Sequence, residues 1–351
     1  MDLVIIKNYF LPLVGSFIVA LIITKLVRDL ALKFKIVDAP TEPRKVHKQP
    51  VPMLGGLAVY LTFVLVTIVF YQAGLLLDGR IQPGHILGII LGGLFLMFGG
   101  WLDDKYRLKP GLQLIWPVLA ALTVILSGMS VSYITNPLGG LLNLGGTVWS
   151  PLLIFFWLLG MMYTTKFLDG LDGLVAGVAV IGSVILFIIS LFWDVPMSGT
   201  SILCLILAGA CLGFLIWNFH PARIFLGEGG SLFIGFMLGV LAIVSGAKIA
   251  TALLIMGIPI LDVIWVIVRR IFKDKKSVWL ADRKHLHFRL LDAGFNHSQA
   301  VIFLYFLTLI FGASAIFQQT VGKLVSLGIL LLVMVILALW LMARDKSRSL
   351  K

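Results

Sequence analysis

Long stretches without a charged side chain constrain this chain more strongly than any other feature of its sequence. Asp, Glu, Lys and Arg are absent from 8–24, 53–77, 85–102, 173–193, 195–222, 229–247, 249–261 and 324–343. Most of these stretches approach or exceed the roughly 20 apolar residues that cross a bilayer as a helix. Charged residues make up 13% of the chain, whereas soluble domains carry about 25%. We therefore expect an all-α integral membrane protein.

The apolar runs divide into about eleven transmembrane helices within a single polytopic domain of residues 1–351. Residues 110–165 are too long for one crossing, and the turn-rich stretch SYITNPLGGLLNLGGTVWSP divides them into two. The predicted spans are 8–27, 53–73, 85–101, 112–129, 150–167, 173–193, 199–217, 231–247, 249–268, 299–319 and 323–343. No small-residue cleavage site follows the first span, so we expect no cleavable signal peptide. Cys204 and Cys211 fall within one span and indicate neither a disulfide framework nor a metal site.

Lysine and arginine orient these spans across the membrane. With the N-terminus outside and the C-terminus in the cytoplasm, the outer side receives few of the 28 basic residues. The residues that fall outside are Lys7, Arg80, Lys248 and Lys323. This distribution follows the positive-inside rule. The net charge of +12 therefore belongs to cytoplasmic loops beside the lipid bilayer and requires no nucleic acid partner.

The unusual polar residues gather in five loops on the predicted cytoplasmic face. Their sequences are DAPTEPRKVHKQPVPMLGG (38–56), GGWLDDKYRLKPG (99–111), TTKFLDGLDGL (164–174), NFHPARIFLGEGGS (218–231) and DRKHLHFRLLDAGF (282–295). A channel or carrier would more often place polar groups near the bilayer midplane, and we find no inverted repeat that favours one. Loops concentrated at one surface instead indicate an enzyme whose active site is formed by cytoplasmic loops.

Five carboxylates lie in these loops. Asp103 and Asp104 are adjacent, and because helix neighbours point about 100° apart, at most one of them faces a given ligand directly. Asp169 and Asp172 are three residues apart and would share one face of a helix. Glu228 lies in a glycine-lined turn before the eighth span. Hard oxygen ligands favour Mg2+, with Mn2+ as an alternative, so we expect a metal ion to neutralise these acids.

Basic groups on the same face complement the carboxylates. These groups are Lys45, His47, Lys48, Arg223, His285, His287 and Arg289. Together with a metal ion, such residues are typical of a site that holds a diphosphate and stabilises charge during phosphoryl transfer. The two histidines of HLH indicate little by themselves, and no nearby Cys or third His completes a zinc site. Asp262 follows GIPIL in the ninth span, where a buried polar group in a proline-broken helix and a part in the chemistry are both open.

Five motifs, taken in order, carry a resemblance to a known family. They are RKVHKQPVPMLGG, LDDKYRLKPG, FLDGLDGL, NFHPARIFLGEGGS and HLHFRLLDAGF. They resemble the polyprenyl-phosphate N-acetylhexosamine-1-phosphate transferase family, which includes the WecA and TagO enzymes and the MraY phospho-MurNAc-pentapeptide transferase. The resemblance covers nearly the whole chain, including span number and orientation. The form of the last motif is closer to the WecA/TagO branch than to MraY, whose motif has three successive histidines.

The resemblance implies a reaction and a set of partners. A UDP-N-acetylhexosamine, with UDP-GlcNAc favoured, would deliver its sugar 1-phosphate to undecaprenyl phosphate and release UMP, with Mg2+ required. The setting would be the bacterial inner (cytoplasmic) membrane, and the product would start a lipid-linked cell-envelope glycan. Open alternatives are the UDP-MurNAc-pentapeptide reaction of peptidoglycan synthesis, a non-catalytic homologue and a membrane transporter. A homodimer is also left open.

The resemblance further implies roles for individual residues. The expected catalytic residues are Asp103, Asp104, Asp169, Asp172, His285 and His287. The expected metal ligands are Asp104, Asp172 and Glu228. The expected substrate contacts are Lys48, Lys166, Asn218, Arg223, Phe225 and Arg289. Among these, Asn218 and Phe225 match positions near the uracil and uridine.

Two residues depart from the family's pattern. Lys166 stands where the family usually has Asn, three residues before the first Asp of DGLDG, and Glu228 stands where the family has Asp. The extra methylene of Glu moves its carboxylate by roughly 1 Å, which matters at a catalytic site. We expect the Lys166 ammonium to reach the carboxylates or the donor's diphosphate, the alternative being a snorkelling lysine at the membrane interface. We also expect the two departures to be linked.

Overall fold

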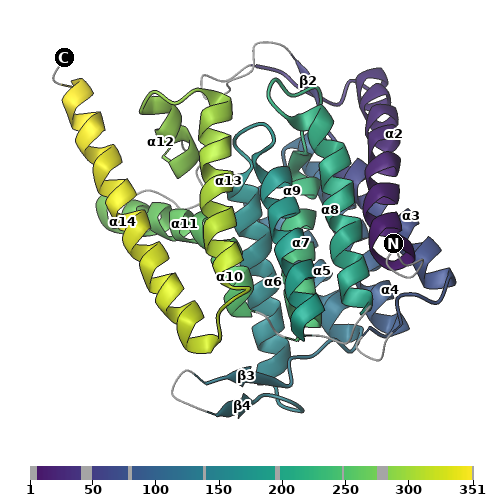
Figure 1. Cartoon of the computed structure of the whole chain (residues 1–351). Helices are drawn as coiled ribbons and strands as arrows, with labels where there is room; N and C mark the ends of the chain where they lie inside the picture. The colour runs from purple at the N-terminus through teal and green to yellow at the C-terminus, as the bar shows by residue number, and fades with distance from the viewer. Residues whose placement is uncertain are drawn as a thin grey trace.

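Helices make up most of the chain, as the apolar runs predict. The structure is a computed structural model that describes residues 6–40, 50–77, 81–136, 140–193, 198–246, 249–274 and 284–349. Its helices form one bundle, with the antiparallel pair β3 (Tyr133–Thr135) and β4 (Leu141–Asn143) at the lower end in Figure 1. A second antiparallel pair, β1 (Val37–Asp38) and β2 (Val51–Pro52), lies at the upper end. Both pairs are too short to change the all-α class.

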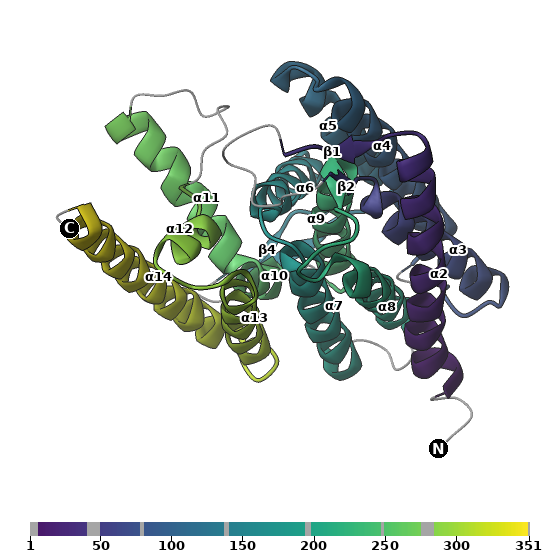
Figure 2. The ribbon, with the colours of Figure 1, turned by 90° about the horizontal axis from the view of Figure 1, so that it is seen from above.

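The helices follow one another along the chain with mostly short connections. In order they are α2 (Leu11–Lys33), α3 (Gly55–Gln72), α4 (Pro83–Tyr106), α5 (Pro110–Leu126), α6 (Trp149–Leu168), α7 (Leu174–Trp193), α8 (Gly199–Asn218), α9 (Gly227–Val244), α10 (Ile249–Ile255), α11 (Gly257–Arg269), α12 (Leu286–Asp292), α13 (His297–Ser314) and α14 (Thr320–Ser349). Two π-helical turns, η1 (Ile6–Phe10) and η2 (Arg270–Asp274), adjoin α2 and α11. Seen from above in Figure 2, α11 to α14 gather on one side of α7 and α9, and α2 to α5 gather on the other.

Within the described residues, nine helices are long and apolar enough to cross a membrane. Each predicted span has a helical counterpart, but α5, which corresponds to 112–129, has 17 residues and is shorter than each of these nine helices. The predicted span 249–268 is divided into α10 and α11, which meet at a bend of 75°, in agreement with the proline-broken helix expected there. Pro259 lies in the first turn of α11, where its missing N–H costs nothing, whereas inside a continuous helix it would remove a hydrogen bond and clash. The count of eleven crossings and their orientation stay predictions.

The central helix α9 is buried along almost its entire length and meets two neighbours backbone to backbone. A Cβ atom placed on Gly100 of α4 would lie 2.1 Å from the N atom of Gly229. A Cβ atom placed on Gly56 of α3 would lie 2.1 Å from the Cα atom of Gly230. The paired glycines of three motifs therefore allow α3, α4 and α9 to converge at the end of the bundle that carries the polar loops.

The loop between α8 and α9 docks on the start of α3. The N–H of Phe225 donates to the carbonyl oxygen of Pro52 (2.8 Å), and the N–H of Gly55 donates to the carbonyl oxygen of Phe225 (2.9 Å). The N–H of Gly56 donates to the carbonyl oxygen of Leu226 (2.7 Å). These bonds satisfy N–H groups that the first turn of a helix leaves without internal partners. They fix the fourth motif against the first.

Candidate active site

A polar cluster forms where the ends of α4, α5, α6 and α9 meet. Lys166, in the last turn of α6, places its Nζ 2.5 Å from Oε1 of Glu228 in the first turn of α9. The same Nζ donates to Oε1 of Gln113 on α5 (2.9 Å), and Nε2 of Gln113 donates to Oδ1 of Asp103 on α4 (2.9 Å). We call Asp103, Asp104, Gln113, Lys166 and Glu228 the carboxylate–lysine cluster. Lys166 was expected to reach the carboxylates of DGLDG or the donor's diphosphate, and the carboxylate that its ammonium contacts is that of Glu228.

The adjacent acids of α4 face different partners, as their positions on a helix predict. Oδ1 of Asp103 accepts from the N–H of Leu108 (2.8 Å), which closes the turn after α4. Oδ1 of Asp104 instead accepts from the N–H of Glu228 (3.2 Å). A Cβ atom on Gly227 would lie 2.7 Å from Oδ2 of Asp104, so glycine is required for this approach. Glu228 therefore lies inside the first turn of α9, not in a turn before it.

The acids of DGLDG do not share a helical face. Residues 169–173 form a turn between α6 and α7, in which Gly173 adopts a φ of 80°, a left-handed conformation that interrupts a helix. Asp169 keeps access to solvent, yet surrounding protein atoms displace much of the water around its carboxyl group. This loss of hydration, with the negative charges of Glu228 and Asp172 nearby, raises the pKa of Asp169 to about 7.

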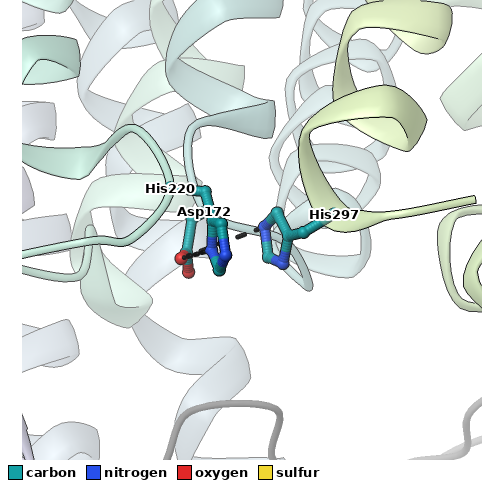
Figure 3. Close-up of side chains that lie close together, drawn as sticks. All are labelled: Asp172, His220 and His297. Atoms are coloured by element: carbon teal, nitrogen blue, oxygen red, sulfur yellow. Dashed lines mark hydrogen bonds and ion pairs between the residues drawn. The ribbon is translucent and has the colours of Figure 1, made fainter.

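Asp172 faces two histidines from distant parts of the chain, as Figure 3 shows. Its Oδ2 accepts from the N–H of Ala222 (3.1 Å) and lies 2.7 Å from Nδ1 of His220. The ring of His297, at the start of α13, stacks on the ring of His220 with centroids 4.0 Å apart and planes 12° apart. Nε2 of His297 lies 3.9 Å from the same carboxylate oxygen. Among the described residues, neither ring nitrogen of His297 has a hydrogen-bond partner.

His285 of the HLH motif is oriented by the acid of α11. Oδ2 of Asp262 lies 2.8 Å from Nδ1 of His285, and its Oδ1 accepts from the N–H of Leu286 (2.8 Å). Both side chains are buried. Asp262 is thus a buried polar group that positions the HLH motif through His285. A part of Asp262 in the chemistry stays a prediction.

His287 lies against the first glycine of DGLDG. A Cβ atom on Gly170 would lie 2.1 Å from Nε2 of His287, so no larger residue fits there without displacing the imidazole. The ring is buried. Burial, together with repulsion from His285 and His297, lowers the pKa of His287 to about 3. His287 is therefore a neutral imidazole at pH 7.

Asn218 ties two of the motifs together. Its Oδ1 accepts from the N–H of Gly173 (3.0 Å), and its Nδ2 donates to the carbonyl oxygen of Ile224 (2.9 Å). This amide therefore fixes the turn after DGLDG against the loop that carries the half-buried Phe225. Contact of Asn218 and Phe225 with a uridine stays a prediction.

The two predicted substrate arginines contact other parts of the protein. The guanidinium of Arg223 lies 5.8 Å from the centre of the Trp217 ring. Arg289 donates to the carbonyl oxygen of Ala338 (3.5 Å), which links α12 to α14. Their contact with substrate stays a prediction. The residues of the first motif that were expected at the substrate or beside it lie outside the described residues: Lys45, His47 and Lys48.

An apolar pocket of about 240 Å³ adjoins the carboxylate–lysine cluster. It lies between α3, α4 and α9, and its walls include Leu57, Phe98, Trp101 and Leu226. Among the described residues that line it, Asp104 is the one with a charged side chain. Asp104 therefore belongs both to the pocket wall and to the polar cluster.

The stretch from α4 to α9 that carries this cluster also identifies the family. The family model described as "Glycosyl transferase family 4" matches residues 86–246. The chain is 33% identical over 331 residues to the "Probable undecaprenyl-phosphate N-acetylglucosaminyl 1-phosphate transferase" of Bacillus subtilis, across 91% of this chain and 87% of that protein. The chain belongs to glycosyl transferase family 4.

Other members of glycosyl transferase family 4 match over a similar extent. The "Decaprenyl-phosphate N-acetylglucosaminephosphotransferase" of Mycolicibacterium smegmatis is 33% identical over 362 residues, across 94% of this chain and 88% of that protein. The "Phospho-N-acetylmuramoyl-pentapeptide-transferase" of Prochlorococcus marinus is 32% identical over 330 residues, across 86% of this chain and 85% of that protein. The family resemblance stated from the motifs is therefore confirmed.

Glu228 does not fit the Mg2+ site that the family implies. Among the described residues, Asp104, Asp172 and Glu228 do not come together as one group of ligands. The ammonium of Lys166 already lies 2.5 Å from the Glu228 carboxylate. A divalent ion on the same carboxylate would lie about 4 Å from that ammonium, where their repulsion reaches roughly 8 kcal/mol at an effective dielectric constant of about 20. We therefore assign no step of the reaction to a metal ion at Glu228.

A second group of possible metal ligands does come together. It consists of Asp172, His220 and His297, whose ligand atoms lie within 4.8 Å of one another. The two imidazoles are nearly parallel, however, so their in-plane lone pairs run side by side and do not converge on one point. The observed contacts describe stacked rings and a hydrogen bond to Asp172. Metal binding by this group would require at least one ring to turn.

Three members of the site were missed by sequence reasoning, although each lies in or near a quoted segment. Gln113 follows the second motif, and only its partners on two other helices reveal its role. His220 lies in the fourth motif, and His297 follows the fifth, but the stacking that joins them is a contact between remote segments. A count of all titratable residues near the five motifs would have included both histidines.

Proposed function

We propose that this chain transfers an N-acetylhexosamine 1-phosphate, with GlcNAc 1-phosphate favoured, from its UDP-sugar to undecaprenyl phosphate and releases UMP. The names of its relatives support this reaction, since they describe N-acetylglucosamine phosphate transfer to undecaprenyl or decaprenyl phosphate. The proposed setting is the cytoplasmic face of a bacterial inner membrane. The proposed product is the first lipid-linked intermediate of a cell-envelope glycan.

The observation that carries the proposal is that Asp104 lies both in the wall of the apolar pocket and in the carboxylate–lysine cluster. One side of this residue belongs to an apolar pocket, which suits the isoprenoid end of a lipid phosphate. The other side belongs to the carboxylate–lysine cluster at the ends of four helices. A lipid phosphate and a water-soluble diphosphate donor must meet at such a boundary between apolar and polar surroundings. Nine of the described helices are long and apolar enough to cross a membrane, which supports placing this boundary beside the lipid.

The reaction requires placement and charge stabilisation more than it requires a strong base. An oxygen of the lipid phosphate attacks the donor's β-phosphorus and forms the new P–O bond. The bond from the β-phosphorus to the bridging oxygen breaks, and UMP departs with that oxygen and its electron pair. Because a phosphate oxygen is already ionised at pH 7, the protein's contribution is to align the two phosphates and to stabilise the charge on the transferring group. We assign that stabilisation to the positive charge of Lys166, which acts while its ammonium contacts Glu228 and Gln113, and to the N–H groups of the HLH imidazoles.

The proposed function is tested with the purified full-length chain in detergent and synthetic undecaprenyl phosphate. UDP-GlcNAc should yield UMP and an undecaprenyl diphosphate-linked GlcNAc, both measured by mass spectrometry. UDP-MurNAc-pentapeptide, the donor of the alternative reaction, should yield far less. Turnover with the pentapeptide donor alone would overturn the choice of donor. No UMP release from any UDP-N-acetylhexosamine would overturn the proposed function.

Membrane sidedness follows from the same proposal, and single cysteines can test it. Lys109→Cys, in the loop after α4, should react with a membrane-impermeant thiol reagent only when the cytoplasmic side is opened. Asn143→Cys, in the β4 hairpin, should react in intact cells. Both positions are exposed, and the native Cys204 and Cys211 are buried, so the background should be low. Labelling of Lys109→Cys from outside intact cells would refute the topology.

A further inference from the structure

We propose that Lys166 is a built-in counter-ion that holds the position at Glu228 which a divalent cation would otherwise take. The expected effect of this counter-ion on UMP release rests on the proposed function. Its expected effect on the binding of a divalent cation does not. The argument starts from where the lysine lies. The side chain of Lys166 is 18% exposed and that of Glu228 is 16% exposed. A lysine that snorkelled to the membrane surface would keep its ammonium in water, so that alternative does not describe Lys166.

The ammonium of Lys166 is held from several sides. Its Nζ contacts Oε1 of Glu228 at 2.5 Å and donates to Oε1 of Gln113 at 2.9 Å. The ring of Tyr163, one turn earlier on α6, lies with its centre 5.6 Å away and offers a cation–π contact. An ammonium has three N–H donors, and these neighbours direct them. The cation is therefore fixed in place and does not sweep through the site.

Gln113 extends this arrangement to a second carboxylate. Its carbonyl oxygen accepts from the ammonium, which leaves its Nε2 to donate to Oδ1 of Asp103 (2.9 Å) and to the carbonyl oxygen of Leu108 (3.0 Å). The orientation of the amide is thus set by its neighbours on both sides. The positive charge of Lys166 is coupled through one amide to the acid pair of α4. A removable metal ion would not need such a fixed relay.

The surrounding charges explain why a cation is needed at this point. Glu228 and Asp104 are joined through the backbone N–H of Glu228, and Asp103 and Asp169 act on the same acids electrostatically. Without a cation, these carboxylates would repel one another and the phosphates of a donor. One ammonium supplies one positive charge where Mg2+ supplies two, and it is carried by the chain itself. The longer side chain of Glu228, compared with Asp, lets its carboxylate extend toward Lys166.

Mn2+ binding to the purified full-length protein tests the proposal without any substrate. Free Mn2+ is followed by electron paramagnetic resonance during a titration. The wild-type protein should bind Mn2+ weakly, and Lys166→Asn should bind it at least about tenfold more tightly, because a repelling charge is removed and a carboxylate is released. Adding Glu228→Gln to Lys166→Asn should abolish the gain. Equal Mn2+ affinity of the wild-type and Lys166→Asn proteins would overturn the proposal.

Two further variants keep the test decisive if Lys166→Asn folds poorly. Glu228→Gln alone should leave Mn2+ binding unchanged from wild type, because this carboxylate is already paired with Lys166; a loss of binding would overturn the proposal. Lys105→Asn is the matched control, since this lysine likewise lies in the last turn of a helix, α4, but its ammonium lies over the rings of Trp101 and Tyr106. The Mn2+ affinity of Lys105→Asn should equal that of the wild type. If it rises as much as in Lys166→Asn, the loss of any one positive charge explains the rise, and the proposal is overturned.

The kinetic consequence separates this inference from the proposed function. The double variant Lys166→Asn with Glu228→Asp should require a different Mg2+ concentration for UMP release than the wild type does. It should also recover part of the rate that Lys166→Asn alone loses. Strictly additive losses in this double-mutant cycle would mean that the two residues do not act together and would overturn the counter-ion role. If no UDP-sugar is turned over but the Mn2+ results hold, the proposed function fails and the counter-ion stands.

Discussion

Replacing Asp104 with asparagine is expected to lower the rate of UMP release at least about a hundredfold, because a group lost or misplaced at the meeting point of donor and acceptor costs about that much. Asparagine keeps the size of the side chain, and its Oδ1 can still accept from the N–H of Glu228. The local packing should therefore persist while the carboxyl group between the pocket and the cluster is lost. Initial rates of UMP release give the result, and the melting temperature in detergent checks that the fold is intact.

Asp29→Asn provides the matched control for this variant. Asp29 lies on α2, its side chain is 54% exposed, and its carboxylate lies 3.9 Å from Arg28. Such an exposed ion pair contributes little to stability, so both rate and melting temperature should match the wild type. A near-normal rate for Asp104→Asn would remove this residue from the reaction and, with it, the observation that carries the proposed function.

The sequence predicts the helices well because the bilayer imposes a simple rule on composition. Charge-free runs of sufficient length locate a helix at every predicted span. The break in 249–268 was expected from the sequence, because Pro259 stands near its middle and proline is tolerated mainly in a first turn. What the pattern does not contain is the bend angle, which depends on how α10 and α11 pack on their neighbours. Local propensity carries no such information.

The sequence predicted part of the site's membership and one of its contacts, but not the contacts between its remote segments. The adjacency of Asp103 and Asp104 correctly implies that they face different partners, since that follows from helix geometry alone. The link between Lys166 and Glu228 was expected from the paired departures and is confirmed as a contact. The stack of His220 on His297 was not predicted, because it depends on how α13 docks beside the loop after α8. Contacts between remote segments require the tertiary arrangement.

A second large effect, on stability and on turnover, is expected at Gly100, where α4 and α9 meet beside the site. Gly100→Ala is expected to lower the free energy of unfolding by about 3 kcal/mol, at the upper end for overpacking, and to lower turnover about a hundredfold. A Cβ atom at this position would lie 2.1 Å from the N atom and 2.2 Å from the Cα atom of Gly229, where 3.4–4 Å is ordinary contact. Backbone atoms cannot rotate away as a side chain can. α4 and α9 must therefore move apart by more than about 1 Å, a displacement sufficient for such a loss of rate.

Gly160→Ala is the control that separates this clash from the general effect of adding a methyl group. Gly160 lies within α6, and nothing would approach its Cβ atom within 4 Å. Alanine there favours the helix by roughly 0.5–1 kcal/mol, so stability should hold or rise and turnover should stay near wild type. Melting temperature and UMP release are measured on both variants under the same conditions. The clash at Gly100 forces a change in the spacing of α4 and α9. Wild-type turnover in Gly100→Ala would therefore mean that this spacing does not set the position of Asp104 relative to Glu228.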